Sequence, residues 1–209
     1  ATTAGFGEWF GRRRGGWRKV LTQTGDNTGD KDRLATLVYQ RTINTPKAWQ
    51  QRGAPKTYDL FVIVNGWRGK AIDRALTAYA REVSGLDSRE LELPDHRTLA
   101  TGGGAHIVAY SGHNRLMDVD EFTWPAPSKN AIGAIEVACL TADYMEATVP
   151  APTRVPLLLT RDFLFANAAP VEATIMAVAT GQGYAAIRRD AAAAYALVQE
   201  TSAKRVFGA

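Results

Sequence analysis

The sequence predicts an α/β protein, a three-layer sandwich built on a mostly parallel sheet. The apolar runs at 105–111 and 131–138 are near-continuous rather than alternating, as in strands that are buried on both faces. Segments with helical spacing surround them, so that strands and helices follow one another along the chain. The composition, 45% hydrophobic and 22% charged over 209 residues, is that of a globular protein with one sizeable core.

The first half of the chain contains one clear strand and one clear helix. Residues 58–64 are an apolar run (Tyr-Asp-Leu-Phe-Val-Ile-Val) typical of a buried strand. The apolar residues of 72–83 keep helical spacing, and Gly85 is expected to end that helix. Residues 33–43 are compatible with either a helix or a strand. Two short elements are also expected, a helix at 48–50 and a strand at 91–93.

The second half begins with the two organising strands and continues with further helices. Asn167 ahead of Pro170 has the pattern of a helix N-cap followed by a proline at the first helical position. Four elements are expected here: helical turns at 141–148, a buried strand at 155–160, a helix from this cap to Gly181, and an alanine-rich helix from 184 to about 204.

The charge is unevenly placed and suggests a division of the chain. Residues 1–56 hold 11 of the 25 Lys and Arg but only 4 of the 21 Asp and Glu, a net charge of +7, which leaves −3 for residues 57–209. The first part also contains several aromatic residues that need burial. We therefore expect residues 1–56 to be a basic, aromatic-rich extension packed on an α/β domain formed by residues 57–209.

The sequence argues against several classes of protein. No apolar run approaches the roughly 18 residues of a membrane span, so no span is expected. A single cysteine excludes an intrachain disulfide framework and a multi-cysteine zinc site. The opening Ala-Thr-Thr-Ala-Gly is small and polar and lacks Met, as in a mature end left by signal-peptide removal, which favours export; a truncated chain would begin in the same way.

The cysteine and one of the three histidines each follow one of the organising strands. His113 comes two residues after the run 105–111, and Cys139 comes directly after 131–138. Ligands bind at the carboxyl ends of parallel strands, and neighbouring strands lie about 4.8 Å apart. A thiolate is intrinsically nucleophilic and an imidazole can take its proton. The pair therefore predicts a hydrolase of acyl bonds, and an inert buried cysteine is the alternative interpretation.

Other residues are candidates for supporting roles. The N–H of Cys139, at a strand end, could help to bind an oxyanion, and Gly112 would let the backbone at His113 turn sharply. The remaining candidates each have a structural alternative: Asn65 lines the cleft or an ordinary turn, Asp118 orients His113 or belongs to a solvated loop, and Asp143 recognises a basic side chain or lies on a helix surface. We predict no joint metal site, because His106 and His113 are seven residues apart and face opposite sides of a strand, and the predicted dyad requires no cofactor.

The two strand ends also carry a family resemblance. Gly112-His113-Asn114 and Val137-Ala138-Cys139 resemble the His-Gly and Ala-Cys motifs of the caspase, legumain and gingipain clan of cysteine peptidases. The chain is also similar to uncharacterised bacterial proteins with Gly-His-x-x-Leu-Met-Asp, here 112–118, and an aromatic residue, here Tyr144, some five residues after Ala-Cys.

This resemblance covers residues 58–200. It implies a caspase-like fold and a peptidase that needs no cofactor, with Cys139 as nucleophile, His113 as base and a peptide or protein as substrate. It also implies that the N–H of Asn114, which stands where the clan has glycine, contributes to the oxyanion hole.

Two other functions are compatible with the sequence. The chain could be a non-catalytic interaction protein that keeps the fold and binds a partner or an anionic polymer through its basic segment, where Arg12-Arg13-Arg14 is followed by Trp17, Arg18 and Lys19. A solvated basic turn is the more common reason for such a run, so nucleic acid is not the expected partner. The third function is an esterase or amidase that uses the same dyad on a small substrate.

Overall fold

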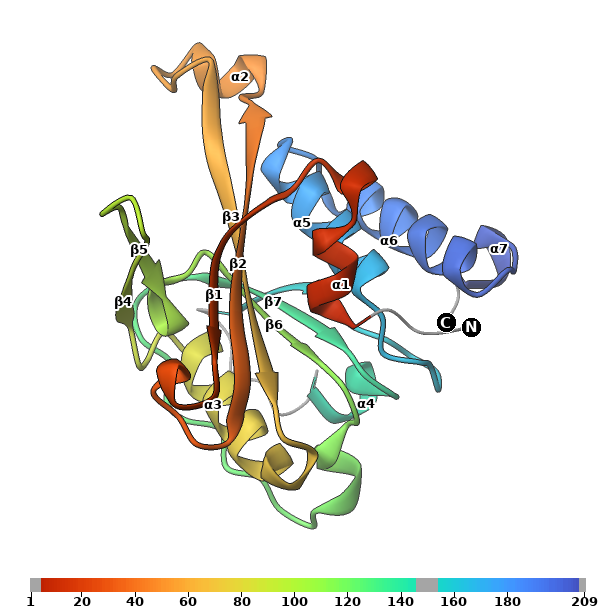
Figure 1. The fold of residues 1–209 in the computed structure, drawn as a ribbon. Coiled ribbons are helices and arrows are strands. Elements are labelled where there is room, and N and C mark those ends of the chain that lie inside the picture. Colours follow the sequence, from red (N-terminus) through yellow and green to blue (C-terminus); the bar gives the residue numbers. More distant parts are fainter. Residues whose placement is uncertain (1–4, 146–153, 207–209) are drawn as a thin grey trace.

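The computed structural model describes residues 5–145 and 154–206 (Figure 1). The helices are α1 (Phe6–Gly11), α2 (Lys47–Gln50), α3 (Ile72–Val83), α4 (Thr141–Met145), α5 (Ala168–Ala179), α6 (Tyr184–Val198) and α7 (Ala203–Val206). The strands are β1 (Arg18–Thr24), β2 (Arg33–Asn44), β3 (Thr57–Trp67), β4 (Arg89–Glu92), β5 (Thr98–Thr101), β6 (Ile107–Ser111), β7 (Ile132–Val137) and β8 (Arg154–Leu158). The chain is a mixed α/β protein.

Most of the predicted elements form where the sequence placed them. The helix expected over 72–83 is α3, the short elements near 48–50 and 91–93 are α2 and β4, and the strand expected at 155–160 is β8. The final alanine-rich helix is divided into α6 and α7. The helical turns expected over 141–148 form α4 as far as Met145, and residues 146–148 lie outside the described residues.

Strands β1, β2 and β3 form an antiparallel sheet in that order. Residues 33–43, which the sequence left open, are part of strand β2, which pairs with β3 from Arg33 opposite Trp67 to Asn44 opposite Thr57. The expected boundary between residues 56 and 57 therefore falls inside a β-hairpin. Figure 1 shows this hairpin as a long arm that carries α2 near its tip.

The expectation that the sheet is mostly parallel is wrong for this part of the protein. Strand β3, the clearest apolar run, pairs antiparallel with its sequence neighbour β2. Strands β4 and β5 form a second antiparallel pair. An apolar run does not indicate strand direction, so the antiparallel pairing of β3 could not be predicted from it.

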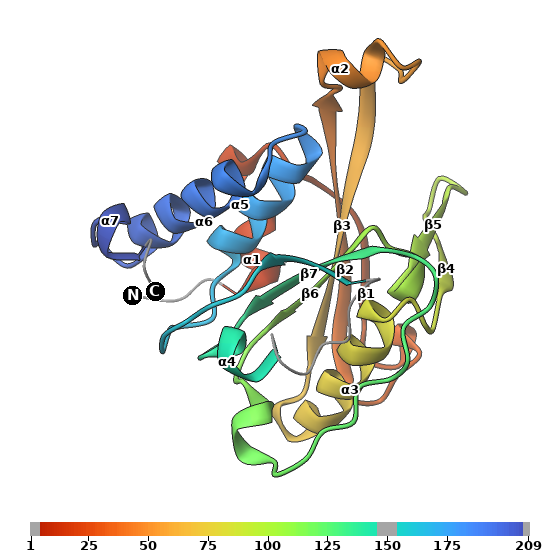
Figure 2. The same cartoon turned by 180° about the vertical axis from the view of Figure 1, so that it is seen from behind.

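Strands β6, β7 and β8 form the parallel sheet that the two organising runs predicted, with β7 in the centre. Every residue of β7 is buried. On one face Ile132 and Ala134 belong to a cluster with side chains of α3, and on the other Ile135 and Val137 pack with α5. Figure 2, from behind, shows the sheet between these helices. Burial on both faces explains why the run is continuous rather than alternating.

Helix α5 begins at the cap that the sequence indicated. The side-chain Oδ1 of Asn167 accepts a hydrogen bond of 2.8 Å from the backbone N–H of Ala169, which satisfies one donor of the first helical turn. Pro170 is the third helical residue rather than the first, which corrects the expected position by two residues. The position is compatible with proline because the first N–H groups of a helix have no partner within it.

Helix α1 and the turn after it are attached to α5 through one buried carboxylate. Glu172 of α5 accepts hydrogen bonds from Trp9 Nε1 (2.7 Å), Trp17 Nε1 (2.8 Å) and an Arg12 guanidinium nitrogen (2.6 Å). The Arg12 guanidinium also lies 3.6 Å from the centre of the Trp9 ring. The beginning of the basic segment therefore uses two of its aromatic residues and one of its cations for internal packing.

Replacing Glu172 by alanine should destabilise the protein by about 3 kcal/mol, because two indole N–H groups and the partly exposed guanidinium of Arg12 lose their common acceptor. In a thermal unfolding experiment we expect a decrease in Tm of about 6–12 °C. Glu8→Ala is the matched control, since Glu8 is exposed on α1. Equal Tm values for the two variants would contradict this role of Glu172.

Candidate functional site

The ends of β6 and β7 lie side by side and in matching register. Ser111 is the residue opposite Val137, and the ladder is extended by a hydrogen bond of 3.3 Å from the N–H of Gly112 to the carbonyl of Val137. His113 and Cys139 each come two residues after this last pair. The two candidate residues therefore leave neighbouring strands at the same edge of one sheet.

Asn114 links the two strand ends. Its side chain is almost fully buried, 3% exposed, and its Nδ2 donates a hydrogen bond of 2.7 Å to the backbone carbonyl of Cys139. Its Oδ1 accepts a bond of 3.1 Å from the N–H of Leu116, which caps the 3₁₀ turn at 115–118. Asn114 thus fixes the segment after His113 to the segment after Val137, a task that glycine at this position could not perform.

The imidazole of His113 is held by a neighbouring carboxylate. His113 Nε2 lies 2.6 Å from Asp118 Oδ2, and an ionised carboxylate only accepts, so Nε2 is the donor, and in the neutral imidazole Nδ1 carries the lone pair. This hydrogen bond, and more weakly Arg115, lowers the pKa of Asp118 below its usual value. Asp118 therefore hydrogen-bonds the imidazole, as the orienting role that the sequence suggested would require.

The backbone of His113 is held by Tyr110. The Tyr110 hydroxyl donates a hydrogen bond of 2.7 Å to the carbonyl oxygen of His113. Burial, together with the nearby Glu136 and Asp73, raises the pKa of Tyr110 to about 12. The hydroxyl consequently remains protonated, and remains a donor, throughout the neutral range.

The thiol of Cys139 is partly buried and directed at a backbone carbonyl. Its Sγ lies 3.6 Å from the carbonyl oxygen of Leu164, to which it donates a weak hydrogen bond. The next residue, Leu140, has a φ of 53°, in the left-handed region that side chains other than Gly and Asn rarely adopt. Such backbone strain is concentrated at functional sites. Among the described residues, the side chains of Cys139 and His113 do not hydrogen-bond each other.

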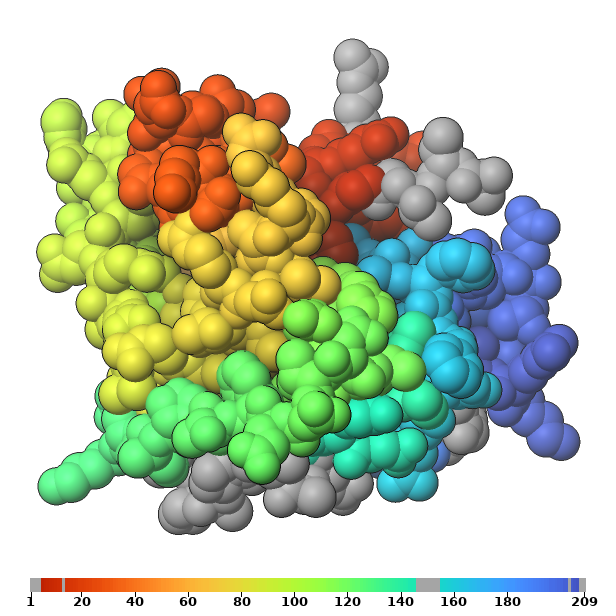
Figure 3. All heavy atoms as spheres, turned by 90° about the horizontal axis from the view of Figure 1, so that it is seen from below, coloured from red at the N-terminus to blue at the C-terminus, as the bar shows by residue number. Residues whose placement is uncertain are grey.

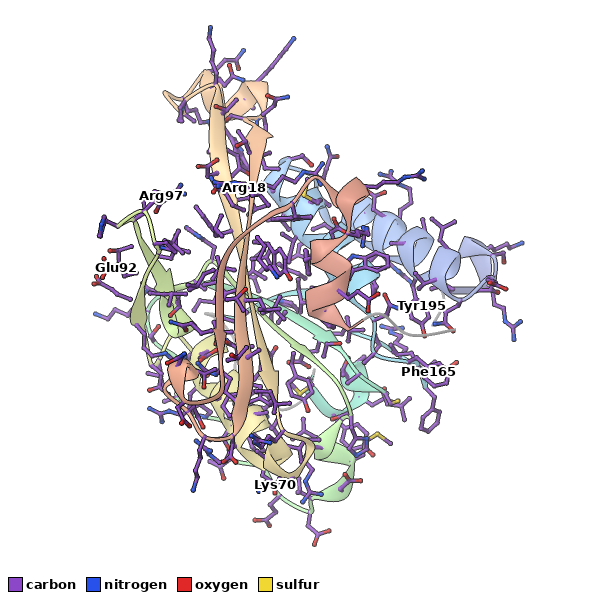
Figure 4. The ribbon with its side chains drawn as sticks, viewed as in Figure 1. Arg18, Lys70, Glu92, Arg97, Phe165 and Tyr195 are labelled. Atoms are coloured by element: carbon purple, nitrogen blue, oxygen red, sulfur yellow. The ribbon has the colours of Figure 1, made fainter. Side chains whose placement is uncertain are left out.

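The loop after β8 forms a third wall of the site, which the sequence analysis missed. The peptide group between Leu164 and Phe165 is bound at both ends: its carbonyl accepts from Cys139, and its N–H donates a bond of 3.1 Å to the Tyr195 hydroxyl of α6. Burial raises the pKa of Tyr195, and the hydrogen bond from the N–H of Phe165 lowers it by a smaller amount. Figure 4 shows Phe165 and Tyr195 on the same side of the molecule.

Two phenylalanines beside this peptide group are unusually exposed. Phe163 and Phe165 are 69% and 70% exposed. In Figure 3 the segment after β6 (green), α4 (turquoise) and the loop after β8 (light blue) meet on one face of the molecule. A signal was present in the sequence, because Phe163-Leu164-Phe165 follows the end of a buried strand without being part of it.

Replacing Tyr195 by phenylalanine should increase the rate at which iodoacetamide alkylates Cys139 at pH 7. The N–H of Phe165 would lose its acceptor, and the Leu164 carbonyl would no longer be fixed opposite the thiol, where it favours the protonated form. We expect about a threefold faster reaction, equivalent to about 0.7 kcal/mol. Tyr184→Phe is the control, since Tyr184 is exposed on the same helix. Unchanged rates would show that Tyr195 does not position this loop.

Asn65 and Gly112 differ from the expectation, and Asp143 lies on a helix surface, one of the two positions that the sequence left open. The strand β3 continues through Asn65 to Trp67, and Asn65 Oδ1 accepts a bond of 2.9 Å from Thr36 of β2, so no turn begins at Asn65. Asp143 is exposed on the short helix α4. Gly112 has a φ outside the left-handed region, and an added Cβ would lie 3.8 Å from the Tyr110 hydroxyl, so glycine is not required for the turn.

Comparison with protein-family models, with curated proteins and with solved structures finds no match to this chain. The caspase-clan resemblance therefore stays a prediction that depends on the strand-end residues. Within residues 5–145 and 154–206, no helix is both long and apolar enough to cross a membrane.

Proposed function

We propose that the chain is a cysteine peptidase of caspase-like architecture that hydrolyses peptide bonds with a Cys139–His113 dyad. The observation that carries the proposal is the matching register of β6 and β7, which brings the two residues to one edge of the parallel sheet. The helices on both faces of that sheet support the three-layer architecture. The third group that a dyad needs for orientation is present as Asp118.

In the proposed reaction His113 Nδ1 takes the proton from Cys139, and the thiolate attacks the carbonyl carbon of the substrate. Nδ1 is the nitrogen suited to this step because Nε2 is bound to Asp118. The N–H groups of Cys139 and of the His113–Asn114 turn would hold the oxyanion. His113 then gives the proton to the leaving amine, and water hydrolyses the thioester and restores the thiol.

The loop after β8 suggests the kind of substrate. Phe163 and Phe165 are exposed on either side of the residue whose carbonyl meets the thiol. Exposed aromatic side chains beside a reactive group favour the binding of apolar residues of a peptide. We therefore expect peptides with apolar side chains near the scissile bond to be preferred.

The alternative of an interaction protein that binds through residues 1–56 has less support. Trp9, Trp17 and Arg12 are bound to Glu172 and are not available together to an external partner. These three side chains therefore do not contribute to the exposed, interleaved surface that the alternative needs.

The test combines a covalent probe with a peptide library. The folded chain is incubated with an acyloxymethylketone that carries an apolar side chain, and mass spectrometry locates the adduct; the urea-unfolded chain gives the rate of an ordinary thiol. We expect labelling of Cys139 to be faster in the folded state, and cleavage of library peptides to disappear in Cys139→Ala. No cleavage, together with labelling no faster than in urea, would exclude the proposal.

A further inference from the structure

A cavity lies on the antiparallel sheet, away from the thiol. It has a volume of about 360 Å³ and is lined by Gly16, Arg18, Gln40, Arg41 and Thr42, where β1 begins beside β2. Figure 4 shows Arg18 beside the arm formed by the β2–β3 hairpin. In the same view, Figure 1 shows α4, next to the thiol, in a different part of the molecule. The proposed peptidase reaction uses none of these residues.

Both arginines that line the cavity are held in place by neutral acceptors. Arg18 donates a hydrogen bond of 2.6 Å to the side-chain Oε1 of Gln40, and Arg41 donates one of 3.2 Å to the carbonyl of Gly15. Arg41 also lies over the ring of Trp17, at 5.9 Å from its centre. Among the described residues, neither guanidinium forms an ion pair with a carboxylate. Their positions are fixed, and their charges are not neutralised.

Gln40 is the buried residue that holds the guanidinium of Arg18 in place. It is 8% exposed, and its Nε2 donates a hydrogen bond of 2.6 Å to Asp59, which fixes the orientation of the amide. Its Oε1 therefore faces the guanidinium groups of Arg18 and Arg97. Arg97 forms ion pairs with Asp59 and Asp95, so the acidic side chains near the cavity already have a cationic partner.

We infer that this cavity binds a phosphate group of a small molecule. A guanidinium has five N–H donors in a planar fork that matches the oxygens of a phosphate. The hydrogen bond of Arg18 to Gln40 and that of Arg41 to Gly15 each use one of these donors. Two such groups around one cavity favour a doubly charged tetrahedral oxyanion over a singly charged carboxylate.

The position of the other cations argues for a small phosphate rather than a nucleic acid. A polynucleotide needs a row of cations along its backbone. Arg12, in the same basic segment, forms an ion pair with Glu172 instead. Among the described residues that line this cavity, the cations without an acidic partner are Arg18 and Arg41, which are enough for one phosphate group.

The test is isothermal titration calorimetry of the full chain at low ionic strength. The probes are inorganic phosphate, glycerol phosphate, acetate and a single-stranded oligonucleotide; the first two distinguish free phosphate from a phosphate ester. We expect a phosphate Kd below about 1 mM, with acetate at least tenfold weaker. Arg18→Gln should weaken phosphate binding about tenfold or more, because a charged donor is lost. Arg14→Gln is the control, an exposed arginine of the same segment that does not line the cavity.

Arg41→Gln should have the same effect as Arg18→Gln. If thermal unfolding shows that the Arg41→Gln protein is not folded, the result for Arg18→Gln decides the test, because Arg18 is exposed. The inference is overturned if phosphate binds no tighter than acetate, if Arg14→Gln weakens binding as much as Arg18→Gln, or if the oligonucleotide binds more tightly than either phosphate.

Discussion

Replacing His113 by alanine should reduce peptide hydrolysis by a factor of about 10²–10⁴, the usual contribution of a positioned general base. The imidazole is 54% exposed, so its removal should leave the free energy of unfolding nearly unchanged. Labelling of Cys139 by the acyloxymethylketone should slow in parallel with hydrolysis. The measurements are kcat/KM on a cleaved library peptide and the labelling rate, each as a function of pH.

His106→Ala is the matched control for this experiment. His106 is an exposed residue directly before β6, at the opposite end of the same strand from His113. A loss of activity shared by both variants would indicate a structural effect on β6 rather than loss of a base. Labelling of Cys139 that is unchanged in His113→Ala would remove His113 from the proposed dyad.

Replacing Asn114 by aspartate should have the largest effect on stability at the site. The carboxylate would keep the acceptor for Leu116 but would place an oxygen and a negative charge where Nδ2 now donates to the Cys139 carbonyl at 2.7 Å. Because the side chain is almost fully buried, we expect a loss of about 3 kcal/mol, seen as a decrease in Tm of about 6–12 °C. The added charge should also slow formation of the Cys139 thiolate and therefore its labelling.

Two further variants separate the effect of the lost hydrogen bond from the effect of the added negative charge. Asn114→Gly removes both hydrogen bonds without adding a charge, so its effect on labelling should be smaller than that of Asn114→Asp. Asn130→Asp adds the same charge at an exposed position and should change neither stability nor labelling. An Asn114→Asp protein as stable as the unmodified chain would show that the link between the two strand ends contributes little.

The candidate site was partly visible in the sequence. His113 and Cys139 could be found because each follows an apolar run, and the carboxyl ends of parallel strands share an edge. The link through Asn114 could not be found, because it joins a side chain to a backbone carbonyl 25 positions away. Tyr195 lies still further along the chain from Cys139, and the sequence of its helix does not indicate which loop the helix contacts.

The fold, like the site, could be predicted from the sequence only in part. The helix α3 and the buried strand β7 follow from periodicity and continuous apolarity, which report burial. The antiparallel pairing of β3 does not follow from its apolar run, and neither does the attachment of the first helix to Glu172. Charge counting suggested a basic extension, residues 1–56, packed on a domain that begins at residue 57, whereas β2 and β3 on either side of that boundary pair in one sheet.

By itself, the sequence determined that β7 is buried on both faces and which two reactive side chains follow the central strands. The tertiary structure decided which strands pair in which direction, which carboxylate holds His113, and which loop lies against the thiol. The physical reason is that hydrophobic periodicity is a local property of the chain, whereas a hydrogen-bond partner or a strand neighbour is selected among groups that only folding brings together.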